Sequence, residues 1–169
     1  MTTPGTSRRW AALVGYLLAG VIIGPHTPGF VADAGIAAQE VDRELHAAAA
    51  RCELAHWRGT AAGRLAEVIV LDQFPRNIHR GTPAAFAHDA MALALAQEAV
   101  AAGALGELSA IERNFLLMPF MHSESRAIHA WAEALYREHA PPENLDFELR
   151  HKAIIDRFGR YPHRNAILG

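Results

Sequence analysis

The amino-acid sequence predicts an all-α protein built from antiparallel helical hairpins. Alanine, the strongest helix former, supplies 34 of the 169 residues, whereas the β-branched residues Val, Ile and Thr together supply 23. Capping residues, prolines and glycines divide most of the chain into stretches of about 12 to 20 residues with short connections. Helices of that length joined by short loops pack as antiparallel neighbours.

Composition also limits the classes of function. The chain is 51% hydrophobic with a formal net charge of −2, which argues against disorder and gives no positive field for nucleic acid or anionic lipid. Its length suits one domain with a buried core. Cys52 is the single cysteine, so an internal disulfide and a multi-cysteine zinc site are excluded.

An apolar segment precedes the main domain. Trp10–Gly24 carries no charge over 15 residues, which is short of the roughly 20 that a straight helix needs to cross a bilayer. One interpretation is a buried core helix. Another is a secretory signal with Arg8-Arg9 before the apolar run and Ala32-Asp33-Ala34 as its cleavage site, although prolines interrupt residues 25–31.

The segment Leu13–Asp33 reads LVGYLLAGVIIGPHTPGFVAD and resembles the first segment of monovalent cation/proton antiporters, above all at GYLLAG and GPHTPGF. The residues from Glu40 onward are too charged to supply the further membrane spans of a transporter. We therefore separate residues 1–37 from a helical domain over residues 41–169. We expect Trp10–Ile23 to be helical, either packed on that domain or exposed as an apolar arm.

The first helix of the domain is expected over Val41–Arg58, where apolar residues, Cys52 among them, recur at three-to-four spacing. Thr60 can cap the next helix, which is expected over Ala61–Phe74. That helix is apolar on more than one face and is therefore expected to be central. Pro75 is expected to end it.

A short strand over Val68–Leu71 is the alternative within this central helix, because the run is rich in β-branched residues. The next helix is expected over Pro83–Gly103, with proline in its first turn and glycine as its stop. Ser109 and Glu112 have the spacing of a capping box, which opens a helix through Leu117.

Two further helices complete the domain. Pro119 is expected to kink or end the preceding helix, and Ser123–His139 forms the next with its apolar residues on one side. The prolines at 141 and 142 separate it from the last helix, which is expected over Leu145–Phe158. Gly159 is expected to cap that helix.

Unusual polar residues gather in three motifs at predicted helix ends: LDQFPRN at 71–77, MHSE at 121–124 and RFGRYPHRN at 157–165. Helix ends are places where unpaired backbone groups and side chains can converge on a ligand. The first and third motifs share an aromatic-proline step followed by Arg-Asn, which indicates one helix-exit device used twice.

In the first motif, Asp72 precedes Arg76 by four residues, a spacing that suits a bidentate ion pair on a helix. One interpretation is a buried brace at the helix end, since paired buried charges are often structural. The other is an arginine that grips an anionic or planar group of a ligand while Asp72 orients it, with Asn77 alongside.

In the second motif, Ser123 or His122 can cap the following helix, and Glu124 in a first turn is favoured by the helix dipole. Capping leaves His122 unexplained. No G-x-S-x-G elbow surrounds Ser123, so a serine hydrolase is not expected. No metal site is expected either, because the ten histidines lack H-x-x-x-H or H-E-x-x-H spacing. A metal site would need convergence in space of His122, Glu124, His151 and His163.

The three motifs LDQFPRN, MHSE and FGRYPHRN, in this order, resemble those of an uncharacterised bacterial domain family with a tetratricopeptide-like (TPR-like) α-superhelix. The resemblance covers about residues 42–169 and implies a TPR-like helical fold. The family has no established biochemical activity to carry over to this chain. Relatives carry a tryptophan-rich segment where this chain has the antiporter-like one, and they continue beyond the position of Gly169.

We expect the three motifs to form one cleft that binds a small anionic molecule. Two arginine forks suit a carboxylate or phosphate, and histidine is the natural proton carrier near neutral pH. The candidates for catalysis are His122, His163 and Glu124. Whether a reaction occurs is left open by the sequence. The candidates for ligand binding are Asp72, Arg76, Asn77, Ser123, Arg164 and Asn165.

The alternative function is a TPR-like module that binds a peptide, with the same motifs bracing helix ends. Clustering at helix ends and loops, rather than along a helix face, favours the pocket. Neither a cofactor nor nucleic acid is expected as a partner, since arginines at helix ends more often brace carboxylates. We expect a cytoplasmic protein, and the alternative is membrane association through residues 10–24.

Overall fold

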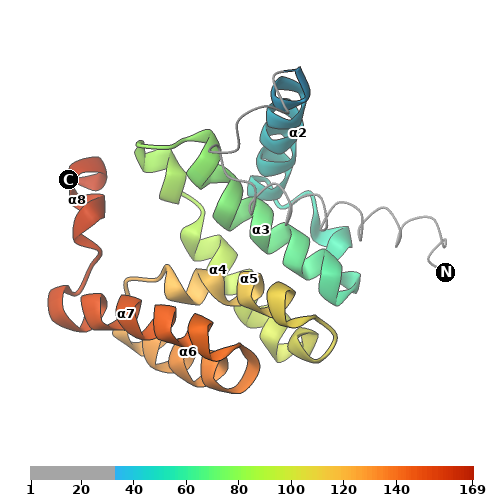
Figure 1. The fold of residues 1–169 in the computed structure, drawn as a ribbon. Coiled ribbons are helices and arrows are strands. Elements are labelled where there is room, and N and C mark those ends of the chain that lie inside the picture. Colours follow the sequence, from blue (N-terminus) through green and yellow to red (C-terminus); the bar gives the residue numbers. More distant parts are fainter. Residues whose placement is uncertain (1–32) are drawn as a thin grey trace.

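The computed structural model describes residues 33–169, with side chains from residue 42 onward (Figure 1). No strand occurs in this part, and the protein is all-α. The antiporter-like segment up to residue 32, with the helix predicted over Trp10–Ile23, lies outside the described residues. The α-helices are α2 (Asp33–Ala50), α3 (Ala61–Ile78), α4 (Asp89–Ala101), α5 (Ala110–Met121), α6 (Arg126–His139), α7 (Pro142–Phe158) and α8 (Asn165–Leu168). Short 3-10 helices, η1 (Ala55–Gly59), η2 (Pro83–Phe86), η3 (Ala104–Gly106) and η4 (Pro162–Arg164), connect them.

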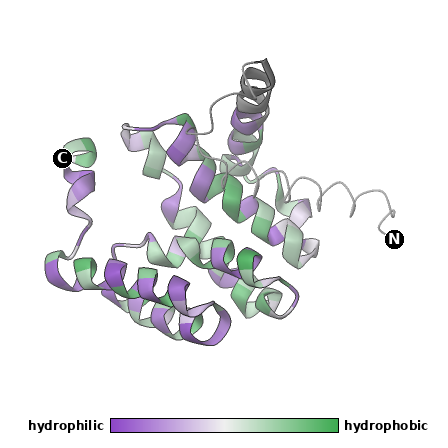
Figure 2. Cartoon of the chain, viewed as in Figure 1, coloured by the Kyte–Doolittle hydropathy of each residue, from purple (hydrophilic) through white to green (hydrophobic). Residues whose placement is uncertain are grey.

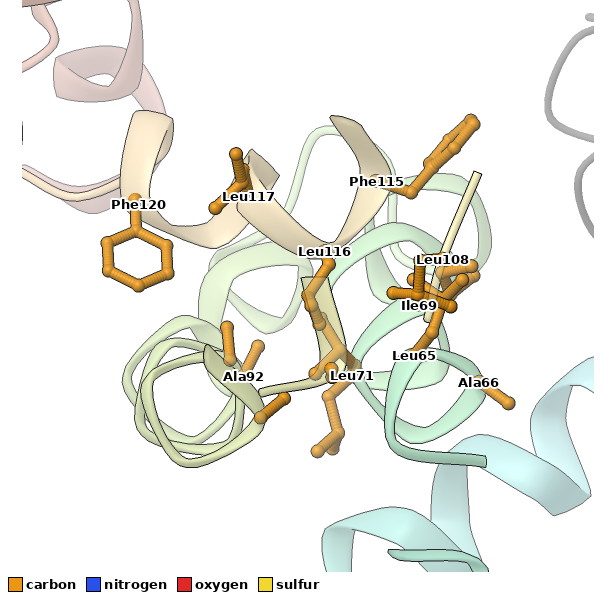
Figure 3. Close-up of a cluster of buried hydrophobic side chains, with 14 of the residues drawn as sticks. Leu65, Ala66, Ile69, Leu71, Ala92, Leu108, Phe115, Leu116, Leu117 and Phe120 are labelled. Carbon is orange, nitrogen blue, oxygen red and sulfur yellow. The ribbon is translucent and has the colours of Figure 1, made fainter. Parts of the chain in front are cut away.

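Helix α3 is the centre of the core, as its apolar residues on several faces predict. It packs against α2, α4 and α5, and Val68–Leu71 is helical and buried, so the strand alternative is wrong. Figure 3 shows Leu65 and Ile69 of α3 gathered near Leu108, and Leu116 of α5 beside Leu71. Burial on every side explains why this helix lacks a polar face.

The C-terminal helices form a second packed group on α5. Helix α6 contacts both α5 and α7, and it buries Ala132, Leu135 and Tyr136 in the same core as α3. The outer turns of α6 and α7 are largely hydrophilic (Figure 2). Among the described helices, none combines the length and the apolar character needed to span a bilayer.

The single helix predicted over Val41–Arg58 is wrong, because α2 ends at Ala50. The amides of Cys52 and Glu53 donate to carbonyls of the last turn at 2.9 and 3.0 Å, the pattern of a Schellman motif. Cys52 adopts the left-handed conformation with φ 60°, which glycine normally occupies at this position, and its side chain is exposed instead of apolar-packed. A sequence search for glycine therefore misses this helix end.

Neither interior proline ends its helix, contrary to the expectation for Pro75 and to one of the two alternatives for Pro119. Helix α3 continues through Pro75 to Ile78, and α5 continues through Pro119 to Met121. A proline lacks one N–H donor, but its φ angle suits a helix. Each of these prolines lies within the last four residues of its helix, so the missing N–H donor belongs to the final turn.

Three other helix bounds also differ from expectation. The stretch over Pro83–Gly103 is divided into η2 and α4, and α6 is capped by Ser125 rather than by the second-motif serine. Helix α7 starts at Pro142, a favoured first-turn position for proline, instead of at residue 145. The predicted caps at Thr60, Ser109 and Gly159 are confirmed.

The 3-10 helix η1 lies directly on the first turn of α3. An added Cβ at Gly63 would lie 1.9 Å from the carbonyl oxygen of Trp57, so this position requires glycine for close approach. Arg58 also donates to the buried carboxylate of Glu67 at 2.6 and 2.7 Å. These contacts hold η1 against the central helix.

Candidate functional site

The carboxylate of Asp72 and the imidazole of His122 form the centre of the candidate site. Asp72 is buried in α3, and His122 is the C-cap residue of α5. His122 Nδ1 lies 2.8 Å from Asp72 Oδ1, although the residues are 50 positions apart in the chain. Helix α5 packs against α3, which brings the first and second sequence motifs together.

The surroundings of Asp72 keep its carboxylate ionised. Burial alone raises its pKa, but His122, Arg76 and Gln73 together outweigh burial, so the pKa lies below its ordinary value of 3.8. Because an ionised carboxylate only accepts, His122 Nδ1 carries the proton of the shared hydrogen bond. The other ring nitrogen, Nε2, is then the atom that can exchange a proton with a ligand.

Asp89 joins the first and third motifs. One of its oxygens accepts a hydrogen bond from Arg76 at 3.0 Å, and the same oxygen lies 3.4 Å from Arg164 Nη1. Burial raises the pKa of Asp89, Arg76 and Arg164 lower it, and Asp72 raises it, with a net increase. The two arginines that follow the repeated aromatic-proline step thus meet at one carboxylate.

The guanidinium group of Arg164 makes cation–π contacts with two aromatic rings. Its guanidinium carbon is 4.6 Å from the ring centre of Phe86 and 4.9 Å from that of Tyr161. The guanidinium of Arg76 lies 5.7 Å from the same Phe86 ring. Cation–π contacts of this kind favour a flat, fixed guanidinium group. The Arg164 side chain is only 8% exposed.

The donors of Arg164 are incompletely used within the described part of the chain. Its Nη2 donates to the backbone carbonyl of His122 at 3.0 Å. Its Nη1 lies 3.4 Å from Asp89 and 3.9 Å from Glu124, and its Nε is buried there without a hydrogen-bond partner. Buried donors normally have partners, so this group is unusual.

The loop that carries His122 is held by Tyr161 and His129, neither of which is among the predicted site residues. Tyr161 donates its hydroxyl to the Met121 carbonyl and its backbone N–H to Glu124 at 2.8 Å. His129 Nε2 lies 2.8 Å from the Ser123 carbonyl. The segment at 121–124 is therefore bound by side chains of α6 and of the C-terminal segment.

Not all of the predicted site residues join this arrangement. The structure brings together the side chains of Asp72, Arg76, His122, Glu124 and Arg164. The side chains of the two motif asparagines do not join it: Asn77 is exposed and accepts from Arg80 at 3.2 Å, and Asn165 is exposed at the start of α8.

The other two predicted residues lie at the margin of the site. His163 is exposed, with its ring centre 5.5 Å from that of Tyr161; burial and Arg164 lower its pKa. The Ser123 hydroxyl accepts from the Ser125 amide at 3.2 Å, a local loop contact. Within the described residues, no group of three or more His, Cys, Asp or Glu side chains is arranged to hold a metal ion.

Sequence reasoning missed several residues of this arrangement. Asp89 resembles an ordinary acidic residue in a first helical turn, and Phe86 resembles an ordinary apolar residue beside it. The buried pair His129 and Glu148, with Nδ1 and Oε1 2.7 Å apart, has no local motif at all. Only Tyr161 had a signal, since it belongs to the third motif.

Comparisons with known proteins place the chain among bacterial proteins without an assigned function. The model of the family described as "Bacterial protein of unknown function (DUF924)" matches residues 31–169. The solved structure of a protein of unknown function, ATU0120 from Agrobacterium tumefaciens, is 37% identical, with a TM-score of 0.77 over 94% of this chain and 90% of that chain. No curated protein matches the sequence.

Proposed function

We propose that this chain, which belongs to the bacterial family DUF924, binds a small anion, a carboxylate or a phosphate, beside Arg164 and His122. The observation that carries the proposal is the state of Arg164. Its guanidinium group lies 4.6 and 4.9 Å from the ring centres of Phe86 and Tyr161, yet it donates one hydrogen bond within the described residues. A guanidinium group has five N–H donors in a planar fork, which matches carboxylate and phosphate oxygens.

The charge balance also points to Arg164 as the ligand-binding cation. Each nearby carboxylate has a closer partner. Asp89 lies 3.0 Å from Arg76 against 3.4 Å from Arg164. Glu124 accepts from the Tyr161 amide at 2.8 Å against 3.9 Å from Arg164. Of the two arginines, Arg76 and Arg164, it is therefore Arg164 whose positive charge is less neutralised. A bound anion would complete its pairing.

In this proposal His122 is the group that exchanges a proton with the ligand. Asp72 accepts the hydrogen bond from Nδ1, so Nε2 is the ring nitrogen left to accept a proton from a ligand or to donate one. Glu124 has a narrower role than the sequence suggested, because its contact with Tyr161 makes it part of the loop support. His163 lies at the exposed margin and would contact a ligand only from outside.

The alternative is a TPR-like peptide-binding module in which the three motifs brace helix ends. Arg76 favours this alternative, because its guanidinium group is engaged with the Asp72 carbonyl, the Asp72 carboxylate and Asp89. A residue with that many partners has little capacity for a ligand. The two functions predict different effects of replacing Arg164. The anion site predicts that stabilisation by anions is lost, and the helix-end brace predicts only a lower stability.

A cytoplasmic location is part of the proposal. Cys52 is exposed and unpaired with any other cysteine. Exposed thiols persist in reducing compartments, whereas oxidising compartments favour disulfides. Small carboxylates and phosphates are also the common anions of that compartment.

The test is thermal unfolding of the full chain with inorganic phosphate or succinate, each compared with sodium chloride at the same ionic strength. A ligand that binds only the native state stabilises it by about 2.7 kcal/mol at 100 times its Kd. We expect the stabilisation in the wild type and its loss in Arg164→Gln. The matched control is Arg150→Gln on the exposed side of α7, whose arginine pairs with Asp146 at 2.5 Å.

Two outcomes would contradict the anion proposal. One is the absence of any stabilisation by either anion beyond that of chloride. The other is an Arg164→Gln variant that keeps the full stabilisation. Lowered stability in that variant, with no response to anions in either protein, would favour the helix-end braces of the alternative.

A further inference from the structure

We propose that Tyr161 and His129 are positioning residues that hold His122 against Asp72, acting through the backbone of the loop between α5 and α6. This inference rests on the proposed role of His122 as the proton-exchanging group. Within the described part of the chain, neither residue forms a hydrogen bond with Asp72 or with the His122 ring, and both bind the loop that carries this ring.

Tyr161 anchors the start and the end of this loop. Its hydroxyl donates to the carbonyl of Met121, the last residue of α5, and its amide donates to Glu124 at 2.8 Å. The last carbonyls of a helix have no partner within the helix, so an outside donor decides how the chain leaves it. Tyr161 is itself buried, at 2% exposure, so the surrounding packing holds the donor in place.

His129 anchors the middle of the loop. Its Nε2 lies 2.8 Å from the Ser123 carbonyl, and a carbonyl only accepts, so Nε2 carries a proton. Its Nδ1 lies 2.7 Å from Glu148 Oε1, and both residues are fully buried. Glu148 thus binds the ring nitrogen of His129 that does not face Ser123. A carboxylate behind a histidine fixes the direction of the ring.

The three contacts act on consecutive residues. The carbonyls of residues 121, 122 and 123 accept from Tyr161, Arg164 and His129 respectively. Local backbone bonds alone are fewer: the amides of His122 and Ser123 donate to α5 at 2.9 and 3.2 Å. Three consecutive carbonyls are thus held by donors outside the loop, and they fix the backbone from which the His122 ring reaches Asp72 at 2.8 Å.

The experiment measures the tautomer of His122 by the 15N shifts of its ring nitrogens in the full chain, without any ligand. In the wild type we expect the Nδ1–H form alone near pH 8. Tyr161→Phe removes the hydroxyl that holds Met121, and we expect a mixture of the two tautomers. Tyr136→Phe is the matched control, because Tyr136 is equally buried and its hydroxyl has no hydrogen-bond partner among the described residues.

A second pair of variants tests the contact of His129 with the loop. This pair tests the proposal by itself if Tyr161→Phe does not fold. In His129→Gln, the side-chain amide nitrogen takes the position of Nε2 and can still donate to the Ser123 carbonyl. The single tautomer of His122 is therefore expected to remain. In His129→Asn, the side-chain amide nitrogen reaches only the position of Nδ1 and cannot donate to Ser123. A mixture of the two His122 tautomers is therefore expected.

An unchanged His122 tautomer in Tyr161→Phe overturns the proposal, even when the variant melts at a lower temperature, because the tyrosine then only stabilises the fold. If Tyr161→Phe does not fold, identical His122 shifts in the two His129 variants overturn it. The readout needs no anion, so its failure is distinct from a failure of phosphate or succinate to bind.

Discussion

At Asp72, burial and charge act on the carboxylate in opposite directions. Burial raises its pKa, and His122 and Arg76 lower it by more, so the folded pKa lies below 3.8. A carboxylate with a lowered folded pKa stabilises the protein above its unfolded pKa. This contribution is lost as the pH falls below 3.8 toward the folded value.

We expect Asp72→Asn to lower the free energy of unfolding at neutral pH by about 3–5 kcal/mol, since it removes the buried carboxylate that binds Arg76 and His122. Its stability should also fall less than that of the wild type below pH 3.8. Urea unfolding between pH 2.5 and 7 measures both effects. Asp156→Asn is the control, because Asp156 is exposed and pairs with Lys152 at 2.7 Å on the surface. Equal losses in the two variants would contradict the argument.

The two buried tyrosines should differ in what their hydroxyl groups contribute. The Tyr161 hydroxyl donates to the Met121 carbonyl, so Tyr161→Phe is expected to cost about 1 kcal/mol of unfolding free energy. The Tyr136 hydroxyl is buried without a partner among the described residues, so Tyr136→Phe is expected to be neutral or stabilising. Chemical denaturation compares them. The reverse order would refute the assigned hydrogen bonding.

At the scale of the elements, the contact between η1 and α3 depends on a missing side chain. A Cβ at Gly63 would overlap the Trp57 carbonyl, and backbone cannot give way as a flexible side chain can. We expect Gly63→Ala to lower the free energy of unfolding by about 1–3 kcal/mol or more. Gly106→Ala is the control, because nothing lies within 4 Å of its added Cβ. A neutral Gly63→Ala in the same denaturation experiment would show that η1 moves away without cost.

At the scale of the whole molecule, three histidines join the first described helix to the rest. His46 of α2 lies 3.2 Å from a ring nitrogen of His88, which precedes α4, and its ring centre is 5.8 Å from that of His79, which follows α3. Burial lowers the pKa of His46, and the other two histidines lower it further.

Because the folded pKa of His46 lies below its ordinary value of 6.5, the unfolded chain binds the proton first as the pH falls. The contribution of His46 to the free energy of unfolding is therefore fully present above pH 6.5 and is lost as the pH falls below it. We expect His46→Gln to remove part of this decrease between pH 6.5 and 5, as measured by urea unfolding. His151→Gln on α7 is the control and should keep the wild-type profile. An unaltered profile in His46→Gln would exclude this cluster as the cause.

Local signals in the sequence were sufficient for the fold class and for several boundaries. The alanine content, the capping residues Thr60 and Ser109, and the stop at Gly159 all act within one turn of helix. Their effect is therefore readable from neighbouring residues. The same approach failed at Cys52 and Pro75, because a left-handed cysteine and a helical proline depend on hydrogen bonds and packing around them.

The sequence by itself determined that this protein is all-α, that α3 is central, and that unusual polar residues lie in three motifs. Only the tertiary structure decided which of them meet. His122 is 50 residues from Asp72 and 42 from Arg164, and Asp89, which joins the two arginines, lies in none of the motifs. Local patterns carry no record of such pairings, since they arise when packed helices bring distant side chains within hydrogen-bond distance. The direction of His122 is thus a property of the packed helices and not of its own motif.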